Sequence, residues 1–250
     1  MITTIQYNSR KLQIDLSKPL DISIPLQASE NNVNAWYVGP PKIEPERDGD
    51  WIASVAEGAS VNFNNIYFNP HAHGTHTECA GHITEKVHSI NQNLKQFFFL
   101  AEVITVAPEG LNGDSVISKK QIQFALGNKK RDAVVIRTIP NTRKQKFSMQ
   151  YAHTNWPYLL NDAVEYLVSK DIKHLLIDLP SIDREKDDGE LAGHNTFWNT
   201  KGKLRLDATI TEFIYVSNKI KDGEYFLNLQ IAPFENDASP SKPVLFEIIE

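Results

Sequence analysis

The stretch from residue 71 to residue 82 concentrates side chains that bind metal ions. It reads His-Ala-His-Gly-Thr-His-Thr-Glu-Cys-Ala-Gly-His and holds four of the eight histidines of the chain, His71, His73, His76 and His82, together with Glu78. Imidazole and carboxylate are ligands that zinc, manganese and iron prefer. A polar strand end with surface histidines accounts for any one of these residues, but the cluster as a whole predicts a metal site.

The spacing within this stretch indicates which side chains act together. In an extended chain, residues two apart point to the same side, so His76 and Glu78 are expected to face one way as two ligands. Gly74 permits a bulge just before them, and such a bulge would bring His71 or His73 onto that side.

Further ligands must come from elsewhere in the chain. His194 lies in a predicted loop with no evident packing role, and Glu212 begins an apolar strand, where an unpaired carboxylate is costly. Both are therefore candidates, whereas His174, inside the apolar run His-Leu-Leu-Ile-Asp, is expected to be structural. Phe197 and Trp198 follow His194 closely and are predicted either to form an apolar wall for a substrate or to pack in the core.

Strands dominate the elements that must position these residues. Runs rich in β-branched and aromatic residues predict strands at 12–16, 22–26, 61–68, 97–106, 133–139, 174–179, 210–216, 226–231 and 244–249. One helix is predicted after Ser118 and Gln121, which have the spacing of a capping box, and a second is predicted to have Asn155 as its cap and Pro157 in its first turn. The polar stretch 141–155 is predicted to be a loop, either near the site or on the surface. Together these elements predict a single α/β domain over residues 1–250, with a large mixed sheet and few helices.

Composition narrows the classes of function. The chain has 250 residues, 41% of them hydrophobic, which is enough to bury the core of one domain. A formal net charge of −5 argues against a nucleic-acid partner, and no apolar run approaches the ~20 residues that span a bilayer. The polar first ten residues argue against a signal peptide. Cys79 is the single cysteine, so no intramolecular disulfide forms, and its side chain is expected to pack inward. Together these features lead us to expect a cytoplasmic protein. The sequence contains no Gly-x-Ser-x-Gly elbow and no glycine-rich nucleotide loop.

Several stretches, in order along the chain, resemble the kynurenine formamidase and cyclase family. Residues 74–82 resemble its signature, His-x-Gly-Thr-His-x-Asp-x-Pro-x-His. The other similar stretches are 14–20 (Asp-Leu-Thr/Ser-x-Pro-Leu), 133–138 (a central strand), 177–183 (Ile-Asp-x-x-Ser-x-Asp), Glu212 with 222–225 (a glutamate strand and a Gly-x-Tyr hairpin) and 237–240 (Gly-Ser-Pro). The resemblance therefore spans nearly the whole chain.

The resemblance implies a swivelling β/β/α fold and a metal-dependent amidohydrolase. Members cleave formamide, amide or cyclic amide bonds of small molecules with zinc or manganese, as homodimers or higher homo-oligomers. Their best-known substrate is N-formylkynurenine, from tryptophan catabolism. The resemblance implies His76, Glu78, His194 and Glu212 as metal ligands, and His82 as a histidine that binds no metal and acts as the acid/base.

Three positions depart from the family signature. Ala72 stands where the family has its first histidine, so His71 or His73 must replace it. We favour His71, because a bulge would turn its side chain to the same side as His76 and Glu78. Glu78 replaces an aspartate and Ala80 replaces a proline. The departures indicate a divergent branch and leave two alternatives open. One is a hydrolase of another cyclic amide, lactone or carbamate. The other is a non-catalytic protein that binds a metal or ligand on the same scaffold.

Overall fold

A closed ring of seven strands forms the centre of the computed structural model, which describes residues 1–249. Neighbours in the ring follow the order β17, β16, β9, β12, β14, β15 and β8, and β8 pairs back with β17. The strands are β8 (His76–Glu78), β9 (Phe98–Val106), β12 (Ala133–Thr138), β14 (His174–Ile177), β15 (Thr209–Glu212), β16 (Gly223–Ile231) and β17 (Ala238–Ile249). Strands β9, β12, β14 and β15 run parallel and the others join antiparallel, so the predicted mixed α/β sheet is confirmed.

Both faces of the parallel strands are buried, which explains their nearly continuous apolar sequences. In β12, Val134 and Ile136 belong to one apolar cluster, while Ala133 and Val135 belong to another. Side chains alternate between the two faces of a strand, so β9, β12 and β14 each contribute to both clusters.

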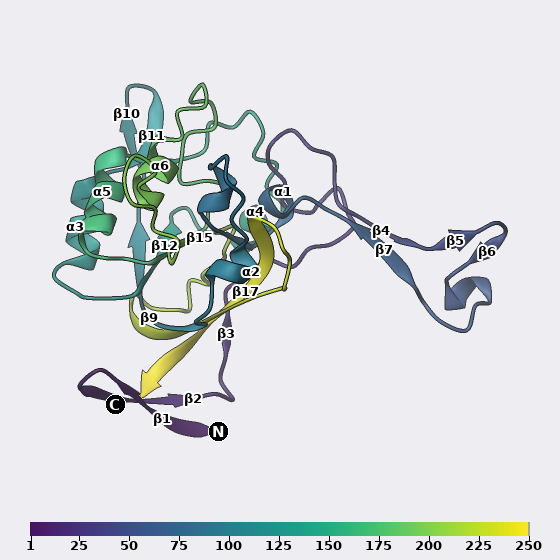
Figure 1. The fold of residues 1–250 in the computed structure, drawn as a ribbon, viewed down its shortest axis with the longest axis horizontal. Coiled ribbons are helices and arrows are strands. Elements are labelled where there is room, and N and C mark those ends of the chain that lie inside the picture. The colour runs from purple at the N-terminus through teal and green to yellow at the C-terminus, as the bar shows by residue number, and fades with distance from the viewer. Residues whose placement is uncertain (250) are drawn as a thin grey trace.

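Three helices supply the partners of the first cluster. They are α3 (Lys119–Leu126), α5 (Asn161–Ser169) and α6 (Ala192–Trp198), which lie together on one side of the sheet (Figure 1). Helix α3 begins with the predicted capping box between Ser118 and Gln121. No helix formed by residues 1–249 is long and apolar enough to cross a membrane.

The remaining elements surround this frame. They are β1 (Ile2–Tyr7), β2 (Arg10–Asp15), β3 (Leu20–Asp21), β4 (Lys42–Pro45), β5 (Arg47–Asp48), β6 (Trp51–Ile52), η1 (Val55–Glu57), β7 (Asn64–Tyr67), α1 (Pro70–His73), η2 (Ala80–His82), α2 (Ile90–Asn93), β10 (Glu109–Leu111), β11 (Asp114–Ile117), α4 (Arg143–Ser148) and β13 (Tyr158–Leu159). Residues 42–67, here called the arm, project from the body as a narrow ribbon (Figure 1).

The predicted start of the second helix is wrong. Helix α5 begins only at Asn161, and Leu159 lies instead in β13, where it pairs in parallel with Ile117 of β11. Asn155 caps nothing, because its side-chain amide donates to Asp114 Oδ1 at 3.0 Å. A pairing with a distant strand thus replaces the first helical turn.

Two strand predictions also need correction, and the predicted loop contains a helix. Residues 22–26 form no strand; the backbone nitrogen of Ile24 donates to the hydroxyl of Thr75 rather than to a neighbouring strand. Strand β15 stops at Glu212 because Phe213 adopts a left-handed backbone angle, φ 53°. The stretch 141–155 contains α4, whose buried Lys146 pairs with Asp178 at 3.1 Å.

Candidate metal centre

The predicted ligands gather at the carboxyl end of β14 and β15. Glu212 is the last residue of β15, and His194 lies on α6, within the segment that links these two parallel strands. Strand β8 lies beside β15, with Glu212 opposite His76 in the register. Residues far apart in sequence therefore converge on one edge of the ring.

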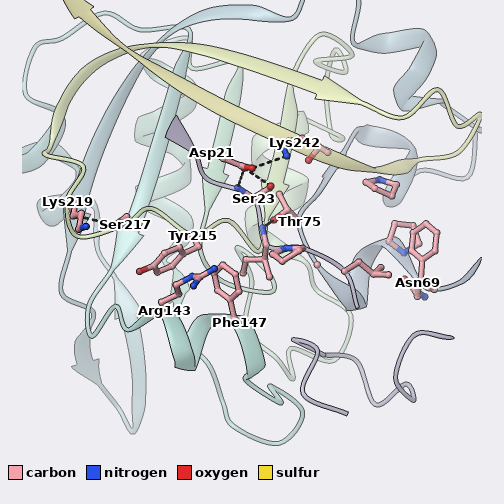
Figure 2. Close-up of a pocket in the computed structure, with 18 residues that line it drawn as sticks. Asp21, Ser23, Asn69, Thr75, Arg143, Phe147, Tyr215, Ser217, Lys219 and Lys242 are labelled. Carbon is pink, nitrogen blue, oxygen red and sulfur yellow. Dashed lines mark hydrogen bonds and ion pairs between the residues drawn. The ribbon is translucent and has the colours of Figure 1, made fainter. Parts of the chain in front are cut away.

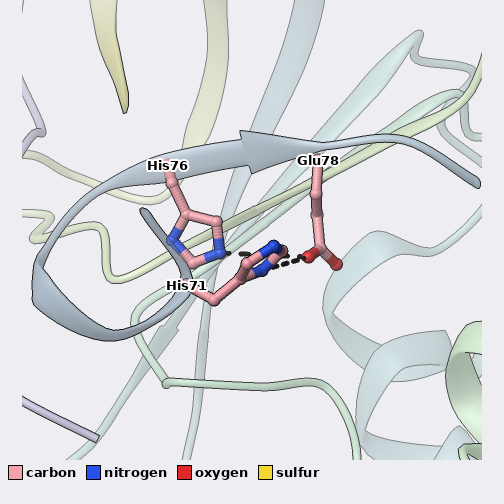
Figure 3. Close-up of side chains that lie close together, drawn as sticks. All are labelled: His71, His76 and Glu78. Carbon is pink, nitrogen blue, oxygen red and sulfur yellow. Dashed lines mark ion pairs between the residues drawn. The ribbon is translucent and has the colours of Figure 1, made fainter. Parts of the chain in front are cut away.

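His76 and Glu78 project together from β8, as their spacing predicts (Figure 3). His76 Nε2 lies 3.9 Å from Glu78 Oε2, and both side chains are completely buried. Strand β8 is paired on both sides, with β15 and β17, so the backbone that carries the two side chains is held firmly.

His71 reaches the same point by a helical turn rather than by the predicted bulge. Asn69 caps α1 by accepting from the backbone nitrogen of His71, and Pro70 occupies the first position of the helix. The turn places His71 Nδ1 3.1 Å from Glu78 Oε2 (Figure 3).

His73, the alternative first ligand, lies outside the cluster. Its Nδ1 accepts from the backbone nitrogen of Asn69 at 2.8 Å, and its Nε2 donates to the carbonyl oxygen of Gly39 at 2.8 Å. Because both ring nitrogens are engaged, His73 has no lone pair left for a metal.

His194 and Glu212 complete the group. His194 Nε2 lies 3.1 Å from Glu78 Oε1 and 3.9 Å from Glu212 Oε1. Glu212 Oε2 lies 3.5 Å from His76 Nε2, and its other oxygen accepts from the backbone nitrogen of Ile182. Three imidazoles and two carboxylates therefore form one connected set of contacts.

The hydrogen bonds of the cluster leave a cation as the fitting occupant. His71 Nδ1, His76 Nε2 and Glu78 Oε2 are buried and have no hydrogen-bond partner. His76 Nδ1 donates to the carbonyl oxygen of Gly74, so its Nε2 presents a lone pair when the ring is neutral. Lone pairs directed at one another repel unless a cation lies between them, and the residues present thus fit a divalent metal.

Burial and the charges of neighbouring groups shift the pKa values of several residues in the cluster. Burial tends to raise the pKa of Glu78, but the neighbouring His82, His194 and His71 hold that pKa well below its usual value. Burial and the nearby charge of Glu78 raise the pKa of Glu212 well above its usual value. Burial also lowers the pKa of His76 to about 3, which keeps this ring neutral and able to bind a metal.

His82 stands beside this group in a more open position. Its ring stacks on that of His71 with centroids 4.2 Å apart, and its side chain is 31% exposed. His82 Nε2 lies 3.8 Å from Glu78 Oε2, which is longer than the contacts of His71 and His194 with the same carboxylate. The position suits a histidine that exchanges protons beside a metal.

Phe197 and Trp198 do not form an accessible wall. Both side chains are fully buried within the cluster under α3, α5 and α6, and the indole nitrogen of Trp198 donates to the carbonyl oxygen of Ala208. Core packing, the other interpretation offered by the sequence, therefore accounts for both residues.

The structure also contains a separate cavity of about 760 Å³ (Figure 2). Its wall includes Gly74 and Thr75, which immediately precede His76, as well as Arg143, Phe147 and Tyr215. Of the residues described, none of the five cluster members lines this cavity, so the cavity is distinct from the metal-binding point.

Two carboxylates near the cluster were absent from the site predicted by sequence. Asp183 accepts from His194 Nδ1 at 2.6 Å, and Asp237 accepts from His71 Nε2 at 2.8 Å. Both lie within motifs that resemble the family, at 177–183 and 237–240, but nothing in their spacing connects either residue with a particular histidine.

Comparison with known proteins identifies relatives over almost the full length. The model of a family described as "Putative cyclase" matches residues 14–184, more than half of the chain. A protein of Bacillus cereus named kynurenine formamidase is 26% identical over 231 residues, which cover 92% of this chain and 97% of the relative. A kynurenine formamidase of Bacillus thuringiensis is 27% identical with the same coverage.

Solved structures share the fold at lower identity. An isatin hydrolase bound to the product analogue thioisatinate has a TM-score of 0.64 at 17% identity, with 93% of each chain covered. Isatin hydrolase A from Labrenzia aggregata has a TM-score of 0.66 at 13% identity, covering 92% of this chain and 93% of the other.

Proposed function

Because the chain belongs to the "Putative cyclase" family, we propose that it is a metal-dependent hydrolase of a formamide, amide or cyclic amide C–N bond. One observation carries the proposal: three buried polar atoms without partners, from His71, His76 and Glu78, converge on one point. Such atoms are costly in a folded protein unless a ligand satisfies them. The same reasoning disfavours a purely structural cluster.

We assign the metal ligands to His71, His76, Glu78, His194 and Glu212. A divalent ion held there supplies an activated water and a Lewis acid that polarises the carbonyl. Imidazole nitrogens and carboxylate oxygens suit both zinc and manganese, and we propose one of these two metals. Asp183 keeps the Nε2 lone pair of His194 directed at the cluster by accepting the proton on Nδ1.

His82 is the proposed acid/base. It is more exposed than His71, with 31% of its side chain accessible against 19%, and it lies within reach of the cluster without being enclosed by it. Its ring takes a proton from the attacking water and delivers it to the leaving nitrogen. A non-catalytic metal-binding protein gains nothing from a histidine in this position.

The substrate class that we propose first is an aryl formamide such as N-formylkynurenine, as the names of the relatives suggest. A cyclic amide is the second candidate, since isatin hydrolases share the fold. The two candidates differ in the product. Hydrolysis of the formamide releases formate, whereas ring opening of the cyclic amide leaves one product with a free amine and a carboxylate.

The decisive experiment measures metal and turnover on one sample. Purified protein is analysed by mass spectrometry for metal per chain and then assayed with N-formylkynurenine and with isatin. Near-stoichiometric zinc or manganese with turnover of either compound supports the proposal. Protein that takes up neither metal after reconstitution overturns it.

We further propose that the whole chain is one domain and that it functions as a homodimer or higher homo-oligomer in the cytoplasm. The arm supports the homo-oligomer, because a narrow two-stranded ribbon is marginally stable alone. Its Phe63, Ile66 and Tyr67 are each more than half exposed and would be covered by a second copy. Light scattering on wild-type protein and on a Phe63→Ser variant tests this contact, and a monomeric wild type contradicts it.

A further inference from the structure

Asp237 is held rigidly at the edge of the metal cluster. It precedes β17, whose first residue, Ala238, pairs with Glu78. The carbonyl oxygen of Asp237 accepts from the backbone nitrogen of Cys79, and that of Asn236 accepts from the backbone nitrogen of Ile90. The main chain at Asp237 is therefore tied to the segment that carries the cluster, and the residue before it is tied to α2.

One oxygen of this carboxylate contacts two histidines. Asp237 Oδ2 lies 2.8 Å from His71 Nε2 and 3.3 Å from His82 Nδ1. The two rings are stacked with an interplanar angle of 24°, so both present a nitrogen to the same oxygen. The opposite nitrogens, His71 Nδ1 and His82 Nε2, then face Glu78 Oε2 at 3.1 and 3.8 Å.

We propose that Asp237 is a positioning residue that orients His71 and His82 together, with the nitrogen of each ring that faces Glu78 free for chemistry. The inference rests on the proposed function in one respect, since it takes the cluster to be a metal site. A carboxylate that accepts from the far nitrogen of a metal-binding histidine fixes the ring orientation and strengthens the ligand. Asp237 does so for the ligand and, through the same atom, for the acid/base.

The need for such a clamp follows from the position of His71. The family signature has its first histidine at the position of Ala72, whereas this chain uses the residue before it, on a single turn of helix. The His71 side chain is 19% exposed, so packing alone does not prevent rotation of the ring. The hydrogen bond to Asp237 selects the rotamer that directs Nδ1 inward.

Metal affinity measured on the metal-free protein is the first test. Asp237→Ala is expected to weaken binding of zinc about 10- to 100-fold, the usual effect of losing such a partner, and Asp237→Asn less, because its amide oxygen still accepts one hydrogen bond. Asp207→Asn is the matched control, since Asp207 pairs with Lys173. Equal zinc affinity in wild type and Asp237→Ala would overturn the inference.

The kcat at saturating zinc provides a second test, because it would not change if Asp237 only stabilised the fold. Once the metal is fully loaded, Asp237→Ala is expected to lower kcat at least tenfold through His82, with KM little changed. An unchanged kcat removes the link to His82. Asp237→Glu is not expected to rescue either effect, because the longer arm shifts the oxygen shared by the two rings.

A third measurement separates this inference from the proposed function. In metal-free protein, the melting temperatures of Asp237→Ala, His71→Ala and the double variant form a cycle. Decreases that do not add demonstrate that the two residues interact, and additive decreases contradict the contact. If wild-type protein takes up no metal at all, the proposed function fails while this cycle still decides whether Asp237 holds His71.

Discussion

Asp183 Oδ2 lies 2.6 Å from Nδ1 of His194, and this pairing leaves Nε2 as the only nitrogen of His194 that faces Glu78. The same carboxylate accepts from the backbone nitrogens of Gly193 and His194, so it is fixed at the start of α6. These hydrogen bonds, with burial opposing them, hold the pKa of Asp183 below its usual value. The orientation of the His194 ring is therefore set by Asp183, on the side of the ring opposite Glu78.

Replacing His76 by alanine is expected to abolish metal binding. His76 is completely buried, and its Nε2 has no hydrogen-bond partner within the described part of the chain, so it is free to bind a metal. Metal per chain, measured by mass spectrometry, should fall to near zero, while the exposed His153→Ala variant should retain wild-type content. Full retention of metal by His76→Ala would refute the ligand assignment.

The His82→Ala variant should keep its metal and lose turnover. His82 lies farther from Glu78 than His71 or His194 does, so its loss leaves the ligands in place. Loss of a general acid/base lowers kcat by roughly 10²- to 10⁴-fold. Steady-state kinetics beside a metal analysis on the same preparation test this, and an active variant excludes the acid/base role.

Restoring the signature at position 72 should not help the enzyme. Ala72 is completely buried on α1, so Ala72→His forces an imidazole into a filled space and costs roughly 1–3 kcal/mol. The double variant His71→Ala with Ala72→His should bind metal more weakly than wild type, because the helical turn directs residue 71 to the cluster. Metal content and chemical denaturation are the measurements, and a double variant with full metal content would contradict the helical placement.

Gly81→Ala is expected to destabilise the fold and displace His82. A methyl group at this position would overlap the carbonyl oxygen of His88, which is main chain and cannot move aside easily. We expect a loss of roughly 1–3 kcal/mol in the free energy of unfolding. Gly110→Ala is the control, because the added atom there meets nothing within 4 Å. Equal stability of the two variants would show that the loop relaxes freely.

Acid should destabilise the protein through His174, far along β14 from the metal cluster. Burial lowers the pKa of His174 to about 3, compared with 6.5 in the unfolded chain. The unfolded state therefore binds the proton more readily, and stability is lost as pH falls below 6.5 toward 3. Between pH 7 and pH 5, the unfolding free energy of wild type should fall by roughly 2 kcal/mol more than that of His174→Gln. Parallel pH profiles of the two proteins in urea would count against this prediction.

The sequence predicted best those elements whose pattern is local. Strands β9 and β12 are continuous apolar runs buried on both faces, and their bounds agree with the prediction to within a residue. The facing of His76 and Glu78 followed from strand geometry alone. These features depend on the alternation of side chains along a strand and on continuous apolar sequence, and both can be recognised from neighbouring residues.

Features that depend on distant partners escaped prediction. Leu159 left the predicted helix because it pairs with Ile117, and Asp237 joined the site because β17 pairs with β8. The route of His71 to the cluster was readable in principle, since Asn69 and Pro70 form a helix start. The sequence could not distinguish this helical turn from the predicted bulge, because both bring the His71 ring to a similar position.

The seam between β8 and β17 also bears on how the protein is made. Strand β8 carries His76 and Glu78, and its second neighbour, beginning at Ala238, is the last strand of the ring. During synthesis, earlier segments leave the ribosome and begin to fold first, whereas contacts between distant parts of the chain form late. A growing chain thus holds the two proposed ligands of β8 long before the strand that encloses them exists. Enclosure of the proposed centre is consequently a late event, timed by the synthesis of β17 rather than by the appearance of the ligands.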